Sequence, residues 1–257
     1  MDNILILKAK HAVTTLLRLL YVPKCAACGA RLSLREAEQG VLCPLCFLRY
    51  ENEKDATCPV CAARLSSCTC LAPGMPKTAA RKMVKLVRYR PREDETSARM
   101  IYTLKHKNLV DLQRFFAGEL AAPLAKILPC EREEYLVTYP PRSRSSYRRD
   151  GFDHAAALGR ELAAKLGVAF LPTLSRGNTG VQKKLSRTAR LQAAAESYAL
   201  RPGVDLHGKH VILVDDIATT GATLTAACRL LRRAGAKEVI FAVLAITPAA
   251  FSGAGRG

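Results

Sequence analysis

The chain has 257 residues, and its 40 lysine and arginine residues outnumber the 22 aspartate and glutamate residues, which gives a formal net charge of +18. The hydrophobic fraction of 49% supplies enough apolar material for a packed core, so a wholly disordered chain is excluded. The absence of any run of about 18 apolar residues argues against a membrane-spanning helix. The positive charge is spread over the whole chain and favours polyanionic ligands, either nucleic acid or phosphorylated small molecules.

Residues 4–20 carry apolar side chains at helical spacing and predict an amphipathic helix that ends before Pro23. We expect this helix, within an N-terminal segment 1–24, to pack on the rest of the protein, and a helix lying on a membrane surface is the alternative. The first residues lack the long apolar stretch and the small-residue cleavage site of a signal peptide. The sequence therefore predicts a cytoplasmic protein in a reducing compartment.

Eight of the ten cysteines are clustered and form two sets of four. In a reducing compartment such clusters are typical of metal ligands rather than disulfides. Four thiolates complete a tetrahedron around zinc and leave no open position, so both sites are expected to be structural. The second set is less typical, because one residue instead of two separates its last pair. The expected ligands are Cys25, Cys28, Cys43 and Cys46 in the first set, and Cys58, Cys61, Cys68 and Cys70 in the second.

The grouping of these ligands follows their order in the sequence, and the spacing leaves a cross-braced arrangement open. A redox-active CxxC is disfavoured, because that chemistry uses a single pair at the start of a helix in a thioredoxin-like setting. A segment with so little apolar material needs metal staples to hold its fold. The sequence thus predicts a double zinc-ribbon module over residues 25–70.

Two prolines and a glycine in residues 71–80 indicate a linker, and a second domain is predicted over residues 81–250. Its strands alternate with its helices, which predicts an α/β domain with a mostly parallel sheet flanked by helices. We expect a mobile loop in the first half of residues 176–190 and a disordered tail at 251–257. The predicted strands are residues 82–89, 136–139, 211–214 and 238–246, and the predicted helices are residues 97–107, 109–128, 152–166 and 223–234.

The most specific motif is the segment 211–224, in which a buried strand is followed by two acids and a loop of small and hydroxylated residues. The strand would deliver Asp215 and Asp216 to the edge of the sheet where ligands bind in open α/β folds. These carboxylates suit ribose hydroxyls or a magnesium ion. The loop and the helix that follows it suit a phosphate, because backbone N–H groups can approach it closely. The expected phosphate-binding residues are Ala218, Thr219, Thr220, Gly221, Ala222 and Thr223.

This segment resembles the phosphoribosyl-pyrophosphate (PRPP) motif of type I phosphoribosyltransferases, which has four apolar residues, two acids and a Thr-Gly loop. A double CxxC module followed by a linker and such a domain resembles the ComF family, and the resemblance covers about residues 15–247. It implies the type I phosphoribosyltransferase fold, binding of PRPP with magnesium, and transfer of phosphoribose to an unknown acceptor. It also implies a bacterial protein with a role in DNA uptake for natural transformation.

The resemblance also implies roles for individual residues. Asp215 and Asp216 would be the catalytic pair that holds the ribose hydroxyls. The loop after the strand 136–139 would grip pyrophosphate and contain a cis peptide at Tyr139-Pro140 or Pro140-Pro141. A mobile hood over residues 178–190 would exclude water from the bound ligand. The further residues expected to contact PRPP are Lys105, Pro141, Arg142, Arg144, Gln182 and Arg190.

The chain departs from the family pattern at two places. It has Asp150-Gly151-Phe152-Asp153-His154 where the family has Arg-Gly-Phe-Asn-Gln, and it has Ala193 where the family has Asn. We expect His154 to start a helix rather than to act as a catalyst. The alternative function is a non-catalytic, zinc-dependent protein that binds single-stranded DNA within an uptake machinery and keeps the PRPP pocket as a sensor or relic. Its small number of stacking aromatic residues weakens this alternative.

Overall fold

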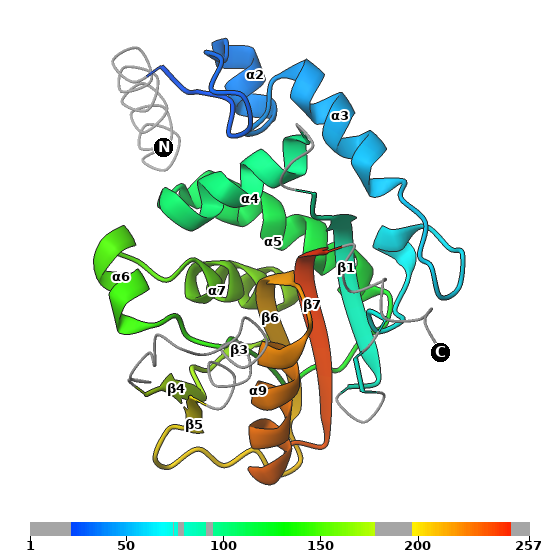
Figure 1. Cartoon of the computed structure of the whole chain (residues 1–257), viewed down its shortest axis with the longest axis vertical. Helices are drawn as coiled ribbons and strands as arrows, with labels where there is room; N and C mark the ends of the chain where they lie inside the picture. The colour runs from blue at the N-terminus through cyan, green and yellow to red at the C-terminus, as the bar shows by residue number, and fades with distance from the viewer. Residues whose placement is uncertain (1–21, 74, 77–79, 91–94, 178–196, 248–257) are drawn as a thin grey trace, which may run out of the picture.

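The computed structural model of the chain describes residues 22–73, 75–76, 80–90, 95–177 and 197–247 (Figure 1). A sheet of five strands, in the order β1-β7-β6-β2-β3, forms the centre of this part of the molecule. Every neighbouring pair in it is parallel, which confirms the sheet expected from alternating strands and helices. The strands are β1 (Lys82–Arg88), β2 (Tyr135–Thr138), β3 (Ala169–Phe170), β6 (His210–Ala218) and β7 (Glu238–Ile246).

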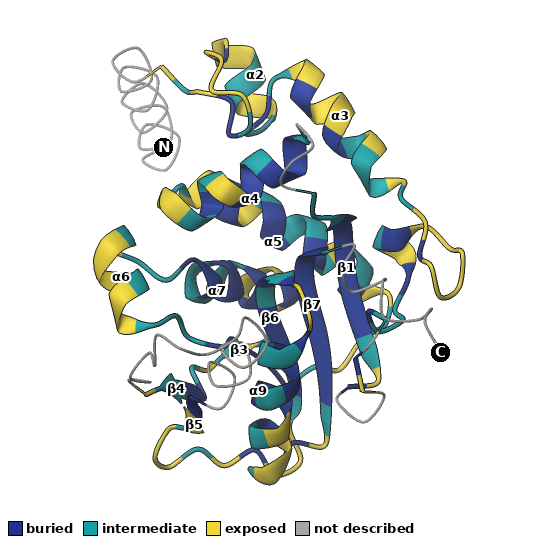
Figure 2. Cartoon of the chain, in the orientation of Figure 1, coloured by how far each residue is buried: buried dark blue, intermediate teal, exposed yellow. Residues whose placement is uncertain are grey.

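Helices cover both faces of the sheet. The helices α4 (Thr96–His106), α5 (Val110–Ala125) and α7 (His154–Leu166) share one apolar core with one face, and α9 (Ala222–Arg233) shares a second core with the other. The central strands are therefore buried on both sides, as Figure 2 shows by their colour.

Side chains of β6 alternate between the two cores. Ile212 and Val214 pack in the core that contains α5 and α7, and Val211 and Leu213 pack in the core that contains α9. This period of two is the elementary geometry of a strand. Continued along β6, it directs Asp216 toward α7 and Asp215 toward α9.

The cysteine-rich segment contains α2 (Leu34–Gln39), α3 (Pro44–Lys54) and the short 3-10 helix η1 (Leu65–Ser67). Its first half packs on α4 and α5. The Tyr50 hydroxyl donates to Glu119 at 3.2 Å, and the Glu53 carboxylate accepts the backbone N–H groups of Thr96 and Ser97 at 2.7 and 2.8 Å. Glu53 thereby satisfies the free donors at the start of α4. These contacts join the segment to the core on the α5 face.

Two short elements complete the described fold. Strands β4 (Leu174–Arg176) and β5 (Tyr198–Leu200) form an antiparallel pair beside the main sheet. The helix α6 (Arg144–Asp150) is capped at its start by Ser143, whose hydroxyl accepts the Ser146 N–H at 3.2 Å, and at its end by Gly151 in the left-handed conformation. No element was predicted for this stretch, because a seven-residue helix has too few apolar positions to show a period.

The structure differs from the sequence-based expectations in the extent of β6 and in the peptide bonds after β2. Strand β6 extends to Ala218, so the two acids lie inside the strand rather than after it. The described residues contain no cis peptide bond, so the expectation of one at Tyr139-Pro140 or Pro140-Pro141 is wrong. Residues 1–21, which include the predicted N-terminal helix, the whole predicted hood (178–190) and the predicted C-terminal tail lie outside the described residues. Among the helices that are described, none is long and apolar enough to cross a membrane.

Candidate functional site

Both predicted cysteine sets converge on a point. Within each set the Sγ atoms lie within 4.8 Å of one another. A tetrahedral zinc ion with Zn–S bonds of about 2.3 Å requires S–S separations of about 3.8 Å. The Sγ atoms of Cys28 and Cys43 are 3.8 Å apart, and those of Cys61 and Cys68 are 3.4 Å apart, so both sets fit such an ion. The sets are Cys25, Cys28, Cys43 and Cys46, and Cys58, Cys61, Cys68 and Cys70, which excludes the cross-braced arrangement.

Each set begins with the same backbone turn. In the first, the Gly29 N–H donates to the Cys25 carbonyl at 2.9 Å, and Gly29 has a φ of +76°. In the second, the Ala62 N–H donates to the Cys58 carbonyl at 2.9 Å, and Ala62 has a φ of +56°. The positive φ turns the chain back so that two cysteines face one point. A non-glycine residue in this conformation stores strain, which the rest of the second site must offset.

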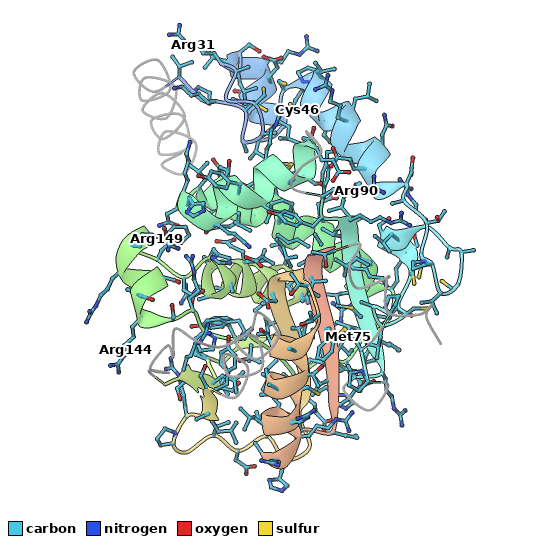
Figure 3. All side chains as sticks on the ribbon, in the orientation of Figure 1. Arg31, Cys46, Met75, Arg90, Arg144 and Arg149 are labelled. Carbon is cyan, nitrogen blue, oxygen red and sulfur yellow. The ribbon has the colours of Figure 1, made fainter. Side chains whose placement is uncertain are left out.

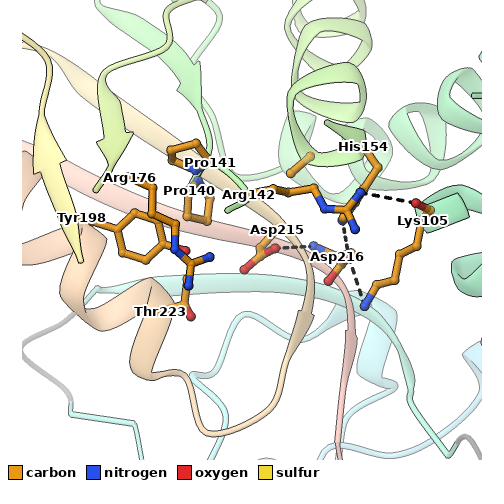
Figure 4. Close-up of a pocket in the computed structure, with 11 residues that line it drawn as sticks. Lys105, Pro140, Pro141, Arg142, His154, Arg176, Tyr198, Asp215, Asp216 and Thr223 are labelled. Carbon is orange, nitrogen blue, oxygen red and sulfur yellow. Dashed lines mark hydrogen bonds and ion pairs between the residues drawn. The ribbon is translucent and has the colours of Figure 1, made fainter. Parts of the chain in front are cut away.

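A cavity of about 250 Å³ opens at the carboxyl end of β6 (Figure 4). It gathers predicted site residues from α4, the loop after β2, β6 and α9, which are far apart in the sequence. The predicted residues that line it are Lys105, Pro141, Arg142, Asp215, Asp216 and Thr223. The other lining residues are Pro140, His154, Ala155, Arg176 and Tyr198.

Asp216 is held on the α7 face of the sheet by a lysine and a histidine. Its carboxylate pairs with the Lys105 ammonium at 3.2 Å and contacts the Nε2 atom of His154, the first residue of α7. Burial raises the pKa of the Asp216 carboxyl, but His154 and Lys105 outweigh that effect and hold its pKa below the usual value. Asp216 is therefore an ionised, buried acid with its charge already balanced.

Asp215 faces the opposite side of the strand and has a different electrostatic environment. Burial, and then the charge of Asp216, raise the pKa of the Asp215 carboxyl to about 8. The Asp215 carboxylate accepts the backbone N–H of Asp216 at 2.9 Å. Thr223 and Tyr198 also line the cavity, and the Arg176 guanidinium lies 5.1 Å from the Tyr198 ring centre. The surroundings thus favour the ionised form of Asp216 and the protonated form of Asp215.

The predicted phosphate loop lies between Asp216 and α9. Ala218 is buried, whereas Thr219 and Thr220 are exposed, and α9 begins at Ala222. Gly221 has a φ of +71°, and a Cβ atom there would lie 2.7 Å from the Met75 side chain. Met75 comes from the linker after the cysteine-rich segment and is buried (labelled in Figure 3). Glycine is required at this position both by the backbone conformation and by the close approach of Met75.

Arg142 lines the cavity, but its side chain already has an anionic partner. The guanidinium pairs with Asp150 at 2.7 Å and lies 3.4 Å from the Lys105 carbonyl and 3.5 Å from the Phe152 carbonyl. The Arg142 backbone N–H donates to Asp153 at 3.0 Å. Asp150 stands where the family has Arg, so this sequence departure supplies a counter-ion for the arginine expected to bind pyrophosphate.

The remaining predicted ligands lie elsewhere. Arg144 is exposed in the first turn of α6 and is not among the residues that line the cavity (Figure 3). Gln182 and Arg190 lie outside the described residues. Thr219, Thr220, Gly221 and Ala222 lie beside the cavity rather than in its lining.

Sequence reasoning expected His154 to begin a helix and did not give it a place in the site. The structure has it both as the first residue of α7 and as the partner of Asp216. Its Nδ1 atom is buried without a hydrogen-bond partner. The sequence contained one signal for the role of His154, namely the replacement of the family's Asn-Gln pair by Asp153-His154. Asp153 became the helix cap, accepting the Ala155 and Ala156 N–H groups.

These features together define a phosphoribosyltransferase-type protein. A parallel sheet ends in two acids, a Thr-Gly loop and a helix start, and two tetracysteine centres precede that domain. The profile of the phosphoribosyl transferase domain family matches residues 149–252. A hypoxanthine phosphoribosyltransferase from Staphylococcus aureus superimposes with a TM-score of 0.36 and 16% sequence identity, over 53% of this chain and 64% of that chain.

Similar proteins of known name identify the family within this class of proteins. The DNA utilization protein YhgH of Salmonella typhimurium is 30% identical over 215 residues, which cover 77% of this chain and 93% of the relative. The competence protein ComFC of Streptococcus pneumoniae is 30% identical over 128 residues, which cover 50% of this chain and 53% of the relative. The chain belongs to the ComF family of phosphoribosyltransferase-like proteins, as its motifs and their order suggested.

Proposed function

We propose that the cavity at the end of β6 binds PRPP with magnesium and that the protein transfers phosphoribose to an acceptor nitrogen. The observation that carries this proposal is the convergence of Asp215, Asp216 and the start of α9 on one cavity. Carboxylates beside a helix N-terminus match a ligand that has both hydroxyl and phosphate groups. The names of the relatives support a role in DNA utilization or uptake.

Each part of the cavity would take a different part of PRPP. The exposed hydroxyls of Thr219 and Thr220, with the N–H groups at the start of α9, would hold the 5-phosphate. Asp215 would accept the ribose hydroxyls. Its carboxylate accepts the backbone N–H of Asp216, whereas the carboxylate of Asp216 is already paired with Lys105 and His154. Lys105 would keep Asp216 ionised and add positive charge next to the pyrophosphate. The acids also offer the oxygen ligands that magnesium prefers, and the bound ion would neutralise pyrophosphate charge.

The proposed reaction is a displacement at C1 of the ribose. The bond between C1 and the pyrophosphate oxygen breaks, pyrophosphate leaves with the electron pair, and the acceptor nitrogen forms a new bond to C1. The nitrogen must then lose a proton, and an aspartate of the pair that lines the cavity would accept it. Arg142 would reach the pyrophosphate when its pairing with Asp150 loosens.

Calorimetric titration of PRPP, in the presence of magnesium, into the protein and into an Asp215→Asn variant tests this proposal. A hydrogen bond to an ionised group contributes about 1.5–3 kcal/mol, so we expect the variant to bind about 10- to 100-fold more weakly. The matched control is Asp205→Asn, an exposed acid outside the cavity, which should bind as the parent protein does. Equal affinity in all three proteins, or no binding by the parent protein, contradicts the proposal.

The cofactor of the two cysteine centres in this proposal is zinc. Four thiolates per site match the ligand set of structural zinc, and their convergence supports two ions per chain. The need for eight reduced thiols also supports a cytoplasmic location. Metal analysis of the purified protein is expected to give two zinc ions per chain.

A second candidate function is the binding of single-stranded DNA. An exposed surface on α4 and α6 combines aromatic and basic side chains, and His106 at the end of α4 contacts Asp150 at the end of α6. Tyr102 and Tyr147 are 63% and 52% exposed, and Arg148, which follows Tyr147 in the sequence, is also exposed. Aromatic side chains stack on bases while basic ones follow the phosphates, so this surface favours single strands.

Fluorescence anisotropy with a labelled single-stranded oligonucleotide tests this second function. Replacing Tyr102 and Tyr147 by alanine is expected to reduce affinity about tenfold or more, since one base stack contributes about 1–3 kcal/mol. The Arg233→Glu variant changes an exposed arginine on α9 and serves as the control. Affinity should fall steeply between about 50 and about 200 mM salt, and affinity indifferent to salt excludes this function.

A further inference from the structure

The middle of β1 carries a lysine in an unusual position. Lys85 is 1% exposed and is one of the largest fully buried side chains in the described part of the chain. A buried ammonium normally has a carboxylate partner, because an uncompensated buried charge is strongly destabilising. Within the residues that the structure describes, Lys85 forms no ion pair with a carboxylate. Its positive charge therefore requires another partner.

The hydrogen bonds of Lys85 identify that partner. Its ammonium donates to the Cys70 carbonyl at 2.6 Å, to the Cys68 carbonyl at 3.3 Å and to the Cys68 Sγ atom at 3.4 Å. The Met83 carbonyl, on the same strand, is a further acceptor at 3.4 Å. Three of the four acceptors thus belong to the second cysteine set, and one of them is a metal-ligand sulfur.

Charge explains why a lysine is placed there. Four thiolates around a divalent zinc ion carry a net charge of −2, which is costly to bury beside an apolar sheet. A lysine ammonium next to Cys68 offsets half of that charge and donates a hydrogen bond to one thiolate. The first cysteine set has no such partner: among the described residues, no lysine or arginine side chain donates to one of its sulfurs. The two centres therefore differ in that an ammonium group donates to a sulfur of the second set.

The same contacts attach the second centre to the sheet. Strand β1 is at the edge of the sheet, and its Met83 N–H donates to the Thr69 carbonyl, between two ligands, at 2.9 Å. Arg88 donates to the Thr57 carbonyl, next to another ligand, at 2.5 Å. The segment that contains η1 thus lies against β1 and covers its free edge (Figure 1). These contacts join the second cysteine set to the edge of the sheet.

We propose that Lys85 is the charge partner of the second cysteine centre and that it selectively stabilises metal binding there. The proposal rests on the zinc assignment made above. Substitutions of residues that hydrogen-bond to metal ligands weaken metal binding by about 10- to 100-fold. Loss of the Lys85 ammonium should therefore accelerate zinc release from Cys58, Cys61, Cys68 and Cys70, and leave the first centre unchanged.

The Lys85→Met variant removes the charge and keeps a long, unbranched side chain that suits a buried site. Methionine fills most of the volume of the buried lysine side chain, so the substitution leaves no large cavity in the core. The matched control is Lys82→Met, which makes the same charge change three residues earlier on β1 at a half-buried position. Circular dichroism of both zinc-loaded variants verifies folding before the metal measurement.

Zinc release from the full-length proteins is followed with a colorimetric chelator, while N-ethylmaleimide traps each cysteine that becomes free. Peptide mapping then assigns each released ion to a centre. For Lys85→Met we expect the residues 58–70 to be alkylated about 10- to 100-fold faster than in the parent protein, with residues 25–46 unchanged. The Lys82→Met control should behave like the parent protein.

Two results overturn the proposal. Parent-like alkylation of residues 58–70 in Lys85→Met shows that the lysine does not support the metal. Equal acceleration at both centres shows general unfolding rather than a local role. If residues 58–70 of the parent protein are alkylated at once, without chelator, the zinc assignment itself fails, and that failure is distinct from the other two.

Discussion

The raised pKa of Asp215 predicts that PRPP affinity depends on pH. In the free protein, burial and the nearby charge of Asp216 keep Asp215 protonated below about pH 8. A protonated carboxyl is a poor ligand for magnesium and a weaker acceptor for ribose hydroxyls, so binding must release its proton. Lys105 acts against this shift, and Asp153 adds to it. Affinity should therefore rise as pH rises through the pKa.

The size of the effect follows from the pKa of about 8. Asp215 is ionised in about one-eleventh of molecules at pH 7 and in about ten-elevenths at pH 9, so affinity should increase about tenfold over that interval. Phosphate groups with a pKa near 6 are already ionised above pH 7, so the ligand contributes little to the change. The stability of the free protein should show the opposite trend. A carboxyl with a raised pKa holds a proton that the unfolded chain has lost, so its contribution falls between about pH 4 and pH 8.

Calorimetry at pH 7, 8 and 9 in buffers of different ionisation enthalpy measures both affinity and proton release. We expect the parent protein to release close to one proton on binding at pH 7 and little at pH 9. The Asp215→Asn variant has no proton to release from this site and should bind with an affinity that changes little over the interval. A flat pH profile for the parent protein, or the same proton release in the variant, would refute the reasoning.

Three further predictions concern other parts of the molecule. The Asp150→Asn variant frees Arg142 from its counter-ion and should bind PRPP several-fold more tightly in the same titration, whereas weaker binding would mean that the pair orders the site. The Gly221→Ala variant puts a Cβ atom 2.7 Å from Met75 in a left-handed backbone, and should lower the free energy of unfolding by about 1–3 kcal/mol in urea denaturation. In a Met75→Ala background the same glycine substitution should cost less than in the parent protein, and an equal cost would assign the whole effect to the backbone. Removal of zinc with a chelator should lower the thermal midpoint of the transferase-type domain as well as unfold the cysteine-rich segment, since both share apolar cores, and re-addition of zinc should restore it.

Local patterns predicted the regular elements well where they were long and periodic. The strand expected at residues 238–246 is β7 with the same bounds, and the helix expected to end at residue 166 is α7, which ends there. The order of the cysteines in the sequence predicted both ligand sets, whereas their spacing left a cross-braced arrangement open. The two acids and the Thr-Gly loop were found because their order in the sequence is itself the motif.

Contacts between distant segments could not be read from the sequence in the same way. His154 and Asp216 lie 62 positions apart in the sequence, and no local pattern at either position predicts their contact. The pairing of Arg142 with Asp150 required the helix α6, which is too short for a detectable period. Lys85 looked like one polar position in an alternating strand, and its burial depends on a cysteine segment that packs on the strand edge. Such partners are set by the tertiary structure, which local propensity does not encode.

A crystal structure of the zinc-loaded protein with PRPP and magnesium tests the central claim most directly. The account predicts the 5-phosphate within hydrogen-bond distance of the backbone N–H groups of residues 219–223, and a ribose hydroxyl within hydrogen-bond distance of the Asp215 carboxylate. Ligand bound elsewhere on the molecule, or an empty cavity in crystals grown at saturating PRPP, would contradict it.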